Sequence, residues 1–166
     1  MRMELIQPFI NAADAVLSET LKCNTRIGDV NMDEEVYRRK GMATLINIHG
    51  DIEGRVILDI DRKTATAIAS ALVGSEVPED DPAVGETIFE LANLVIGNAV
   101  TTLNDEGFRF KIEPPLPHTS ETGMAGSEDT EALVMAFDVP NGTVYMNIAM
   151  RYNRRRKAER EAVVGG

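Results

Sequence analysis

Cysteine, histidine and tryptophan are almost missing from this sequence of 166 residues. Cys23 is the single cysteine, His49 and His118 are the two histidines, and tryptophan does not occur. One cysteine excludes an internal disulfide and a cysteine-based metal cluster. A nucleophilic Cys23 would need a nearby base, so a reduced, partly buried thiol is the better interpretation. Neither histidine has a ligand partner at useful spacing, and the acidic run 76–81 lacks calcium-loop spacing. The sequence therefore predicts no metal site.

Positive charge is also scarce. The chain has 17 Lys and Arg against 27 Asp and Glu, a formal net charge of -10. Nucleic acids and anionic membranes bind basic patches, so neither is expected as a partner, and the basic stretch 154–160 is interpreted as a solvated terminus. No apolar run approaches the length of a membrane span, and the start MRMELIQPFINAADAV lacks a signal-peptide pattern. These features predict a cytoplasmic protein.

The apolar content is enough for one folded domain. Hydrophobic residues make up 43% of the chain and no low-complexity segment interrupts them. A chain of this length accommodates one well-packed domain and is short for two. We expect a single domain over residues 1–153, followed by a charged tail over 154–166.

Two stretches repeat one order of elements: helix, strand, connection, hairpin. In residues 3–60, apolar spacing predicts a helix over 3–21 and a strand over 22–30, and alternation predicts a hairpin over 42–60. In residues 85–150 the same order is a helix over 85–104, a strand over 108–112 and a hairpin over 133–150 around Asn141-Gly142.

A short helix links the two units, capped by Asp61 and ended by Gly74. Asp81 and Pro82 open the region of the second unit's helix, and the prolines 114, 115 and 117 end the strand that follows it. The pattern predicts an α+β fold in which a mostly antiparallel sheet of about six strands carries its helices on one face.

The helix predicted over Gly85–Asn104 has two contrasting sides. At 3.6 residues per turn, one stripe is apolar and the opposite stripe is polar. The apolar stripe consists of Ile88, Ala92, Val95, Ala99 and Leu103, and the polar stripe of Glu86, Glu90, Asn93, Gly97, Thr101 and Asn104. The first is expected in the core and the second in solvent.

The polar stripe is not composed like an ordinary solvated face. Asn93, Gly97 and Asn98 are poor helix formers, and a mid-helix glycine alone costs roughly 1 kcal/mol against alanine. Gly97 would let another surface approach the helix backbone, and Leu94 at the edge of the stripe offers an apolar contact. We interpret the stripe as a docking face that contains two chemically useful side chains, Glu90 and Asn93.

Glu-x-x-Asn alone is a weak signal, and a solvated face would explain it as well. Its context is more specific. The segment ELANLVIGN lies on a helix after one helix-strand-hairpin unit and before another strand and hairpin, and the first helix begins with Pro-Phe-Ile-Asn-Ala. Over about residues 3–150 the chain resembles the CheC/CheX/FliY family of chemotaxis phosphatases, and within it the CheX-like members.

The resemblance implies that an acid and an amide on one exposed helix enter the active site of a phosphorylated CheY-type response regulator. By motif position Glu90 is the acid, which pairs with a lysine of the receiver, and Asn93 is the amide, which orients the attacking water. Mg²⁺ would be bound by the receiver, with no cofactor bound by this chain. Glu86 stands where the family has Ser or Asp, so it is carried over only as a partner contact, beside Leu94 and Gly97.

The chemistry of the two side chains supports these roles. Phosphoryl transfer depends on positioning and charge stabilisation, and a neutral amide both donates to and accepts from a water without losing a proton. A carboxylate in that place would repel the phosphate, whereas one turn away it would attract a lysine. The i, i+3 spacing brings both groups side by side.

Some members of the family carry a second motif on the first helix. When Leu21 is laid over Leu103, Asn11 falls on Asn93 but Pro8 falls on Glu90, so the first helix keeps the amide and lacks the acid. This predicts one active site per chain, and the resemblance to CheX-like members implies a homodimer.

Two other functions remain open at this point. A non-catalytic module would use the same face to dock a receiver or a flagellar switch component, although such a module has no need of a water-orienting amide. A small-molecule sensor would need an apolar internal pocket, and the alternating strands do not indicate one.

Overall fold

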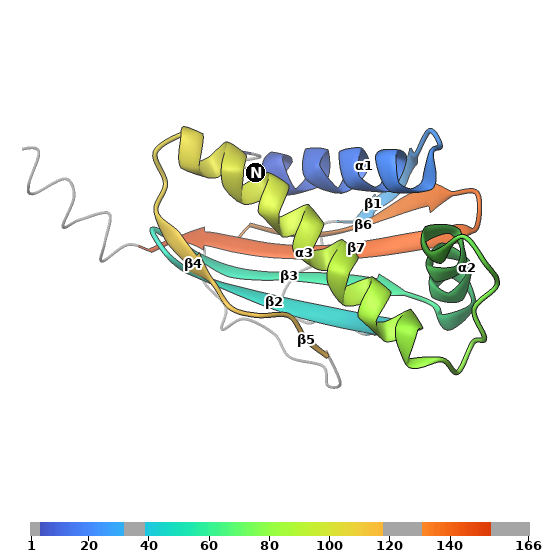
Figure 1. The fold of residues 1–166 in the computed structure, drawn as a ribbon. Helices are drawn as coiled ribbons and strands as arrows, with labels where there is room; N and C mark the ends of the chain where they lie inside the picture. The colour runs from blue at the N-terminus through green and yellow to red at the C-terminus, as the bar shows by residue number, and fades with distance from the viewer. Residues whose placement is uncertain (1–3, 32–38, 118–130, 154–166) are drawn as a thin grey trace, which may run out of the picture.

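The computed structural model describes residues 4–31, 39–117 and 131–153, and the side chains of 29–31 and 131 are not described. In these residues seven strands form one antiparallel sheet, and three helices pack on one face of it (Figure 1). This arrangement confirms the predicted α+β class. The elements are α1 (Gln7–Leu21), β1 (Arg26–Asn31), β2 (Met42–Gly50), β3 (Ile52–Ile60), α2 (Arg62–Val73), α3 (Pro82–Asp105), β4 (Phe110–Ile112), β5 (Leu116–Pro117), β6 (Glu131–Val139) and β7 (Gly142–Tyr152).

The two predicted units exchange strands in the sheet. The strand order is β1-β6-β7-β3-β2-β4, with every neighbouring pair antiparallel. The first strand of one unit, β1, pairs with the hairpin β6–β7 of the other, and β4 in turn pairs with the hairpin β2–β3. The two hairpins meet through β3 and β7 at the centre, so neither unit forms a separate sheet.

The prediction of about six strands did not include β5. Strands β4 and β5 both pair with β2, the first at Ile48–Gly50 and the second at Thr44–Leu45. Pro114 and Pro115 separate them, and a proline has no N–H to donate to the ladder. The prolines therefore interrupt this edge of the sheet instead of ending it, and the pairing resumes at Leu116.

Two other boundaries differ from the predictions. Lys22 has a left-handed conformation at the end of α1, and its N–H bonds to the carbonyl of Ser18, so β1 begins at Arg26 and not at Lys22. In the second hairpin Val139 pairs with Gly142, so the turn residues are Pro140 and Asn141. Gly142 itself opens β7. This position requires glycine, because its φ is +146° and a Cβ there would lie 2.1 Å from the Thr64 hydroxyl of α2.

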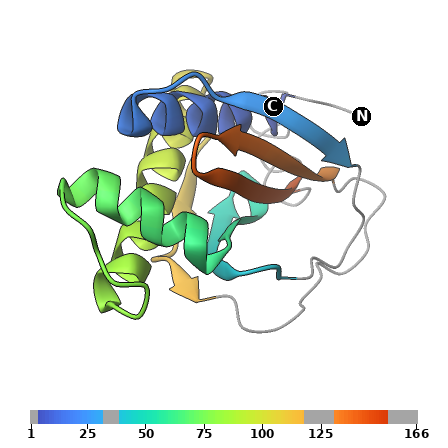
Figure 2. The same ribbon diagram turned by 90° about the vertical axis from the view of Figure 1, so that its right-hand side faces the viewer.

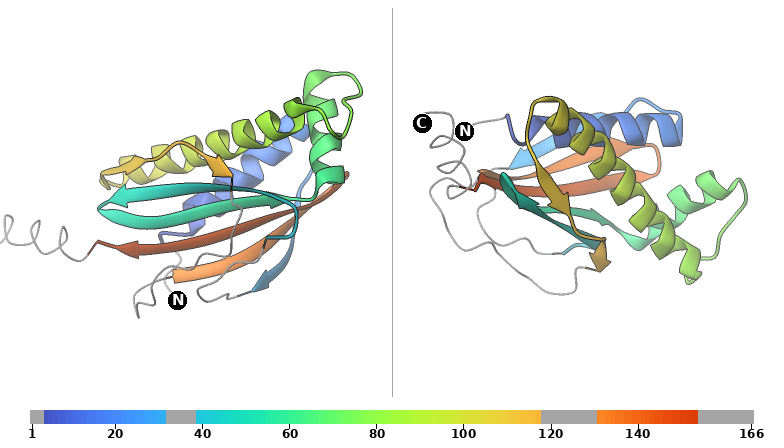
Figure 3. Two further views of the ribbon diagram at one scale, coloured as in Figure 1. Left: turned by 90° about the horizontal axis from the view of Figure 1, so that it is seen from below. Right: turned by 60° about the vertical axis from the view of Figure 1, so that its left-hand side comes forward.

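The helices α1 and α3 pack against each other on one face of the sheet, and α2 lies at one end, as the turned views show (Figures 2 and 3). Their apolar sides and the inner residues of the central strands form one continuous core. Within the described part of the chain, α3 is the one helix that has the length and apolar composition of a membrane span, with a mean hydropathy of 1.2. The apolar stripe of α3 is buried in this core, and a buried core helix can have the same length and apolar composition as a membrane span.

Candidate docking and catalytic face

The helix α3 spans 24 residues and starts three residues before the predicted Gly85. The side chain of Asp81 accepts a hydrogen bond of 2.9 Å from the N–H of Ala83. Pro82 occupies the first turn, where backbone N–H groups make no intrahelical hydrogen bond, so the N–H that proline lacks is not needed there. The predicted start signal at Asp81-Pro82 is confirmed. A long helix fixed at its N-terminus and packed on the sheet gives its outer side chains defined positions.

The two predicted sides of α3 are confirmed by burial. All five members of the apolar stripe are buried, and all six members of the polar stripe are exposed. Leu94, at the edge of the polar stripe, is 48% exposed. The sequence-predicted site residues Glu86, Glu90, Asn93, Leu94 and Gly97 therefore share one solvent-facing side of α3.

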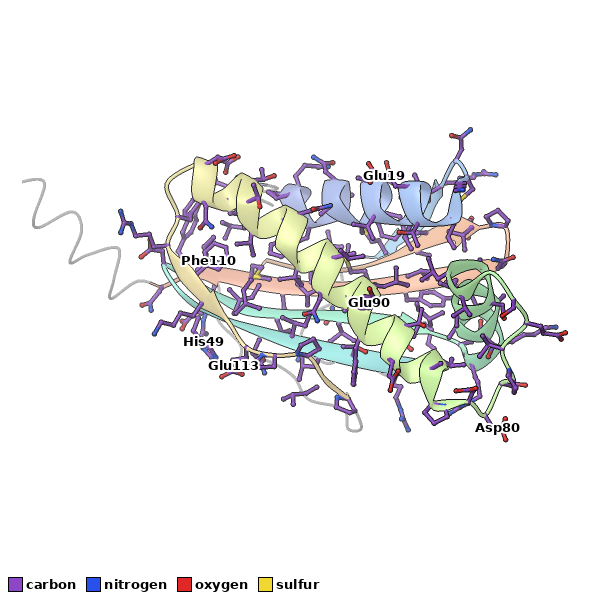
Figure 4. The ribbon with its side chains drawn as sticks, in the orientation of Figure 1. Glu19, His49, Asp80, Glu90, Phe110 and Glu113 are labelled. Carbon is purple, nitrogen blue, oxygen red and sulfur yellow. The ribbon has the colours of Figure 1, made fainter. Side chains whose placement is uncertain are left out.

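Glu90 and Asn93 lie near the middle of this side, one turn apart, and Figure 4 shows Glu90 on the surface that faces away from the sheet. Neither side chain makes a hydrogen bond or ion pair with any residue that the structure describes. Their carboxylate and amide groups are therefore available to another molecule, and no internal contact has to break first.

Gly97 is not required by the fold of this chain. A Cβ built on it would meet nothing within 4 Å, and its backbone is helical. By contrast, a Cβ on Gly54 in β3 would lie 2.0 Å from the carbonyl oxygen of Ala149. Internal packing thus explains Gly54 but leaves Gly97 unexplained, and the helix propensity of glycine is unfavourable. A smooth, exposed stretch of helix backbone is what a closely approaching partner would need.

A groove between α1 and α3 adjoins this face. It has a volume of about 380 Å³ and is lined by Glu4, Gln7, Pro8, Asn11, Ala12 and Ala15 from the first helix region and by Asn98, Thr102 and Glu106 from α3 and its end. Asn11 is exposed and accepts a hydrogen bond of 2.8 Å from Gln7 Nε2, whereas Pro8 is buried. Sequence analysis did not assign the groove, although the poor helix formers at exposed positions of α3 were a signal for it.

The other chemically notable residues do not gather at this face. His49 Nε2 lies 3.2 Å from Glu113 Oε1 in a pair that is about half exposed, and Cys23 is a partly buried free thiol. His118 lies outside the described residues. Among the residues that the structure describes, no three His, Cys, Asp or Glu side chains cluster as metal ligands do.

The fold and the face define a class of protein: an α+β domain that presents an acid and an amide on one exposed helix over a sheet of two interleaved units. Residues 42–138 match the family model described as "Chemotaxis phosphatase CheX", and this segment contains α3. The match covers more than half of the chain, so the chain belongs to the family of the chemotaxis phosphatase CheX.

Known proteins with similar sequences and folds agree with this assignment. The "CheY-P phosphatase CheX" of Thermotoga maritima is 25% identical over 116 residues, which are 69% of this chain and 75% of that protein. A chain in the crystal structure of the CheX-CheY-BeF3-Mg complex from Borrelia burgdorferi is 32% identical, with a TM-score of 0.70 over 90% of this chain and 99% of that one. A CheC-like superfamily protein from Shewanella sp. PV-4, 23% identical, shares the fold, with a TM-score of 0.78 over 91% and 99% of the two chains.

Proposed function

We propose that this chain is a cytoplasmic phosphatase that hydrolyses the aspartyl phosphate of a CheY-type response regulator. The observation that carries the proposal is the exposed Glu90–Asn93 couple on α3, whose side chains have no partner among the residues that the structure describes and which lies inside the segment that matches the family model. The relative from Thermotoga maritima is named a CheY-P phosphatase, and the one from Borrelia burgdorferi was crystallised with CheY, BeF3 and Mg²⁺. Both names support a phosphorylated receiver as the substrate.

Asn93 would orient the attacking water. In the hydrolysis a bond forms between the water oxygen and phosphorus, and the bond from phosphorus to the receiver's aspartyl oxygen breaks. The aspartate leaves as a carboxylate, and the inorganic phosphate keeps the protons of the water. The amide of Asn93 accepts a hydrogen bond from the water through its oxygen, and its NH₂ donates to the phosphoryl group without adding negative charge. A side chain on a packed helix holds the water in line with little motion.

Glu90 would pair with a lysine of the receiver. The exposed Glu90 carboxylate has no hydrogen-bond or ion-pair partner among the described residues, so a lysine of the receiver could pair with it. Such a pair fixes the register in which the helix enters the receiver. Glu86, Leu94 and Gly97 would form the surrounding contact. The Mg²⁺ ion would belong to the receiver, with no cofactor bound by this chain.

We also propose that two copies of the chain associate, as the resemblance to CheX-like proteins implies, and the mass in sedimentation velocity checks this.

A second candidate function is a non-catalytic module that docks a receiver by the same face. Glu86 favours this alternative, because its side chain is longer than the Ser or Asp that the family has at this position and would change how closely a receiver approaches the helix.

The test is the rate at which a phosphorylated, Mg²⁺-bound CheY-type receiver loses phosphate. We expect the wild type to accelerate the loss, Asn93→Ala to lower kcat about a hundredfold or more, and Glu90→Ala to raise KM for the receiver about tenfold or more. Asn104→Ala is the matched control, because Asn104 is an exposed asparagine on the same stripe of α3 at its far end.

An unchanged receiver lifetime, with binding still measurable, would identify the chain as a docking module. In that case Glu86→Ser is the variant to examine for restored hydrolysis. An equal loss of kcat in Asn93→Ala and Asn104→Ala would rule out a specific water-orienting role for Asn93.

A further inference from the structure

We infer that the groove between α1 and α3 is a second part of the docking surface, and that it receives a lysine- or arginine-bearing segment of the same receiver. The inference rests on the proposed function for the identity of the partner. It adds residues on two elements, above all Asn98, Thr102 and Glu106 on α3 and Asn11 on α1, to a site otherwise confined to one stripe of one helix.

The groove continues the candidate face without a break. Leu94, Asn98, Thr102 and Glu106 follow one another at intervals of four residues, so they form one row along α3 and its C-terminal end. Gln7, Asn11 and Ala15 form the corresponding row on α1, on the other wall of the groove. A partner that contacts the exposed Leu94 therefore meets the mouth of the groove in the next turn of the helix.

The charge of the groove favours a cationic occupant. Its lining contains two carboxylates, Glu4 and Glu106, and none of the other lining residues is ionisable. The Tyr152 hydroxyl donates a hydrogen bond to the Glu4 carboxylate, which holds that group at its end of the groove. An arginine or lysine would gain charge-assisted hydrogen bonds there, whereas an acidic segment would be repelled.

The side-chain amides of Asn98 and Asn11 in the groove can form hydrogen bonds with a polar partner. Asn98 makes no side-chain hydrogen bond to any residue that the structure describes, and the Asn11 oxygen already accepts from Gln7 Nε2 at 2.8 Å, which leaves the Asn11 NH₂ to donate. Asparagine and threonine at exposed helix positions lower helix stability relative to alanine. As with Gly97, contact with another molecule accounts for residues that the helix itself does not favour.

The experiment measures kcat and KM for dephosphorylation of the Mg²⁺-bound receiver by three variants. Glu106→Lys reverses a charge in the groove, Asn98→Ala removes an amide from it, and Glu19→Lys makes the same charge change nearer the C-terminal end of α1, one turn beyond Ala15 and outside the groove lining (Figure 4). Neither groove variant is expected to weaken folding, because a lysine at a helix C-terminus and an alanine within a helix are both favourable.

We expect Glu106→Lys to raise KM about tenfold and Asn98→Ala about threefold, with kcat unchanged in both. Glu19→Lys should change KM less than about twofold, since it lies outside the groove. In about 1 M salt the difference between Glu106→Lys and the wild type should shrink, because screening at that ionic strength acts within about 3 Å.

The experiment distinguishes a failure of the groove proposal from a failure of the proposed phosphatase activity. If the wild type dephosphorylates the receiver and both groove variants keep its KM, the inference is overturned while the proposed function stands. If the wild type binds the receiver without hydrolysis, binding constants replace KM, and the same ratios between variants support the groove while the proposed catalysis fails. An equal effect of Glu19→Lys and Glu106→Lys would show that the overall charge acts, and not the groove, which also overturns the inference.

Discussion

At the residue scale, Asp61 shows how one side chain ends a strand and starts a helix. Its carboxylate accepts hydrogen bonds of 2.8 Å from both the backbone N–H and the hydroxyl of Thr64. These two bonds, the backbone one first, lower the pKa of the Asp61 carboxyl below its ordinary value, against a smaller opposing effect of burial. The same Thr64 hydroxyl lies 3.3 Å from the carbonyl of Asn141, so the cap also contacts the β6–β7 hairpin.

The cap makes stability depend on pH. Because the folded pKa of Asp61 is lowered, its contribution is present above the unfolded value of about 3.9 and is lost as pH falls through the folded value. We expect Asp61→Ala to lower the free energy of unfolding by about 1 kcal/mol at pH 7, and the gap to the wild type to narrow below about pH 4.

Urea unfolding at several pH values measures this effect. Asp61→Asn is the control, because it keeps a capping acceptor and loses the titrating group. If Asp61→Ala and the wild type stay equally far apart from pH 7 to pH 2.5, the carboxylate does not act through its charge.

At the element scale, the two sides of α3 differ in burial and in composition. The buried side stabilises the fold through apolar contact with the sheet and α1. The exposed side contains residues that weaken the helix, and Gly97 is the clearest case, since nothing in the described part of the chain occupies the space where its Cβ would be. Stability and partner contact should therefore respond in opposite directions to a change at this position.

We expect Gly97→Ala to raise the free energy of unfolding by about 0.5–1 kcal/mol, through helix propensity, and to raise KM for the receiver at least severalfold. Gly85→Ala in the same helix is the matched control. Its Cβ would meet Met42 at 3.8 Å, an ordinary contact, and it lies outside the exposed stripe, so it should stabilise without affecting KM. A Gly97→Ala protein that is more stable and keeps its KM would refute a close approach at this glycine.

At the scale of the whole molecule, the sheet joins the two units through the pairing of their hairpins. Strand β3 pairs with β2 of its own hairpin along one edge and with β7 of the other unit along its second edge. Gly54 permits this pairing, because any Cβ there would collide with the carbonyl oxygen of Ala149 in β7. The core that supports α3 thus depends on the centre of the sheet.

We expect Gly54→Ala to lower the free energy of unfolding by about 2–3 kcal/mol through overpacking, with unfolding still a single transition. Gly28→Ala in the edge strand β1 is the control. Its Cβ would come within 3.2 Å of the flexible end of the Asp138 side chain, so a change of about 0.5 kcal/mol or less is expected. Chemical denaturation followed by both circular dichroism and phosphatase activity tests the prediction, and two separate transitions would show that the units unfold independently.

The sequence by itself determined the features that depend on neighbours along the chain. The period of α3, the caps at Asp61 and Asp81 and the stop at Gly74 arise within one or two helical turns, and so does the i, i+3 spacing of Glu90 and Asn93. Both side chains come from one exposed helix, so the candidate site was predictable before the fold. The roles given to them came from a family resemblance, because exposure and spacing alone do not specify a reaction.

Tertiary structure decided which distant segments meet. The alternating patterns do not specify that β1 pairs with β6 and not with its own hairpin, since hydrophobic burial is not directional and either pairing would cover the same faces. The return of β5 to β2 after Pro115 and the close approach of Thr64 to Gly142 depend on contacts far apart in sequence. The groove exists only because α1 and α3 pack side by side, and that contact places Asn11 and Asn98 on facing walls.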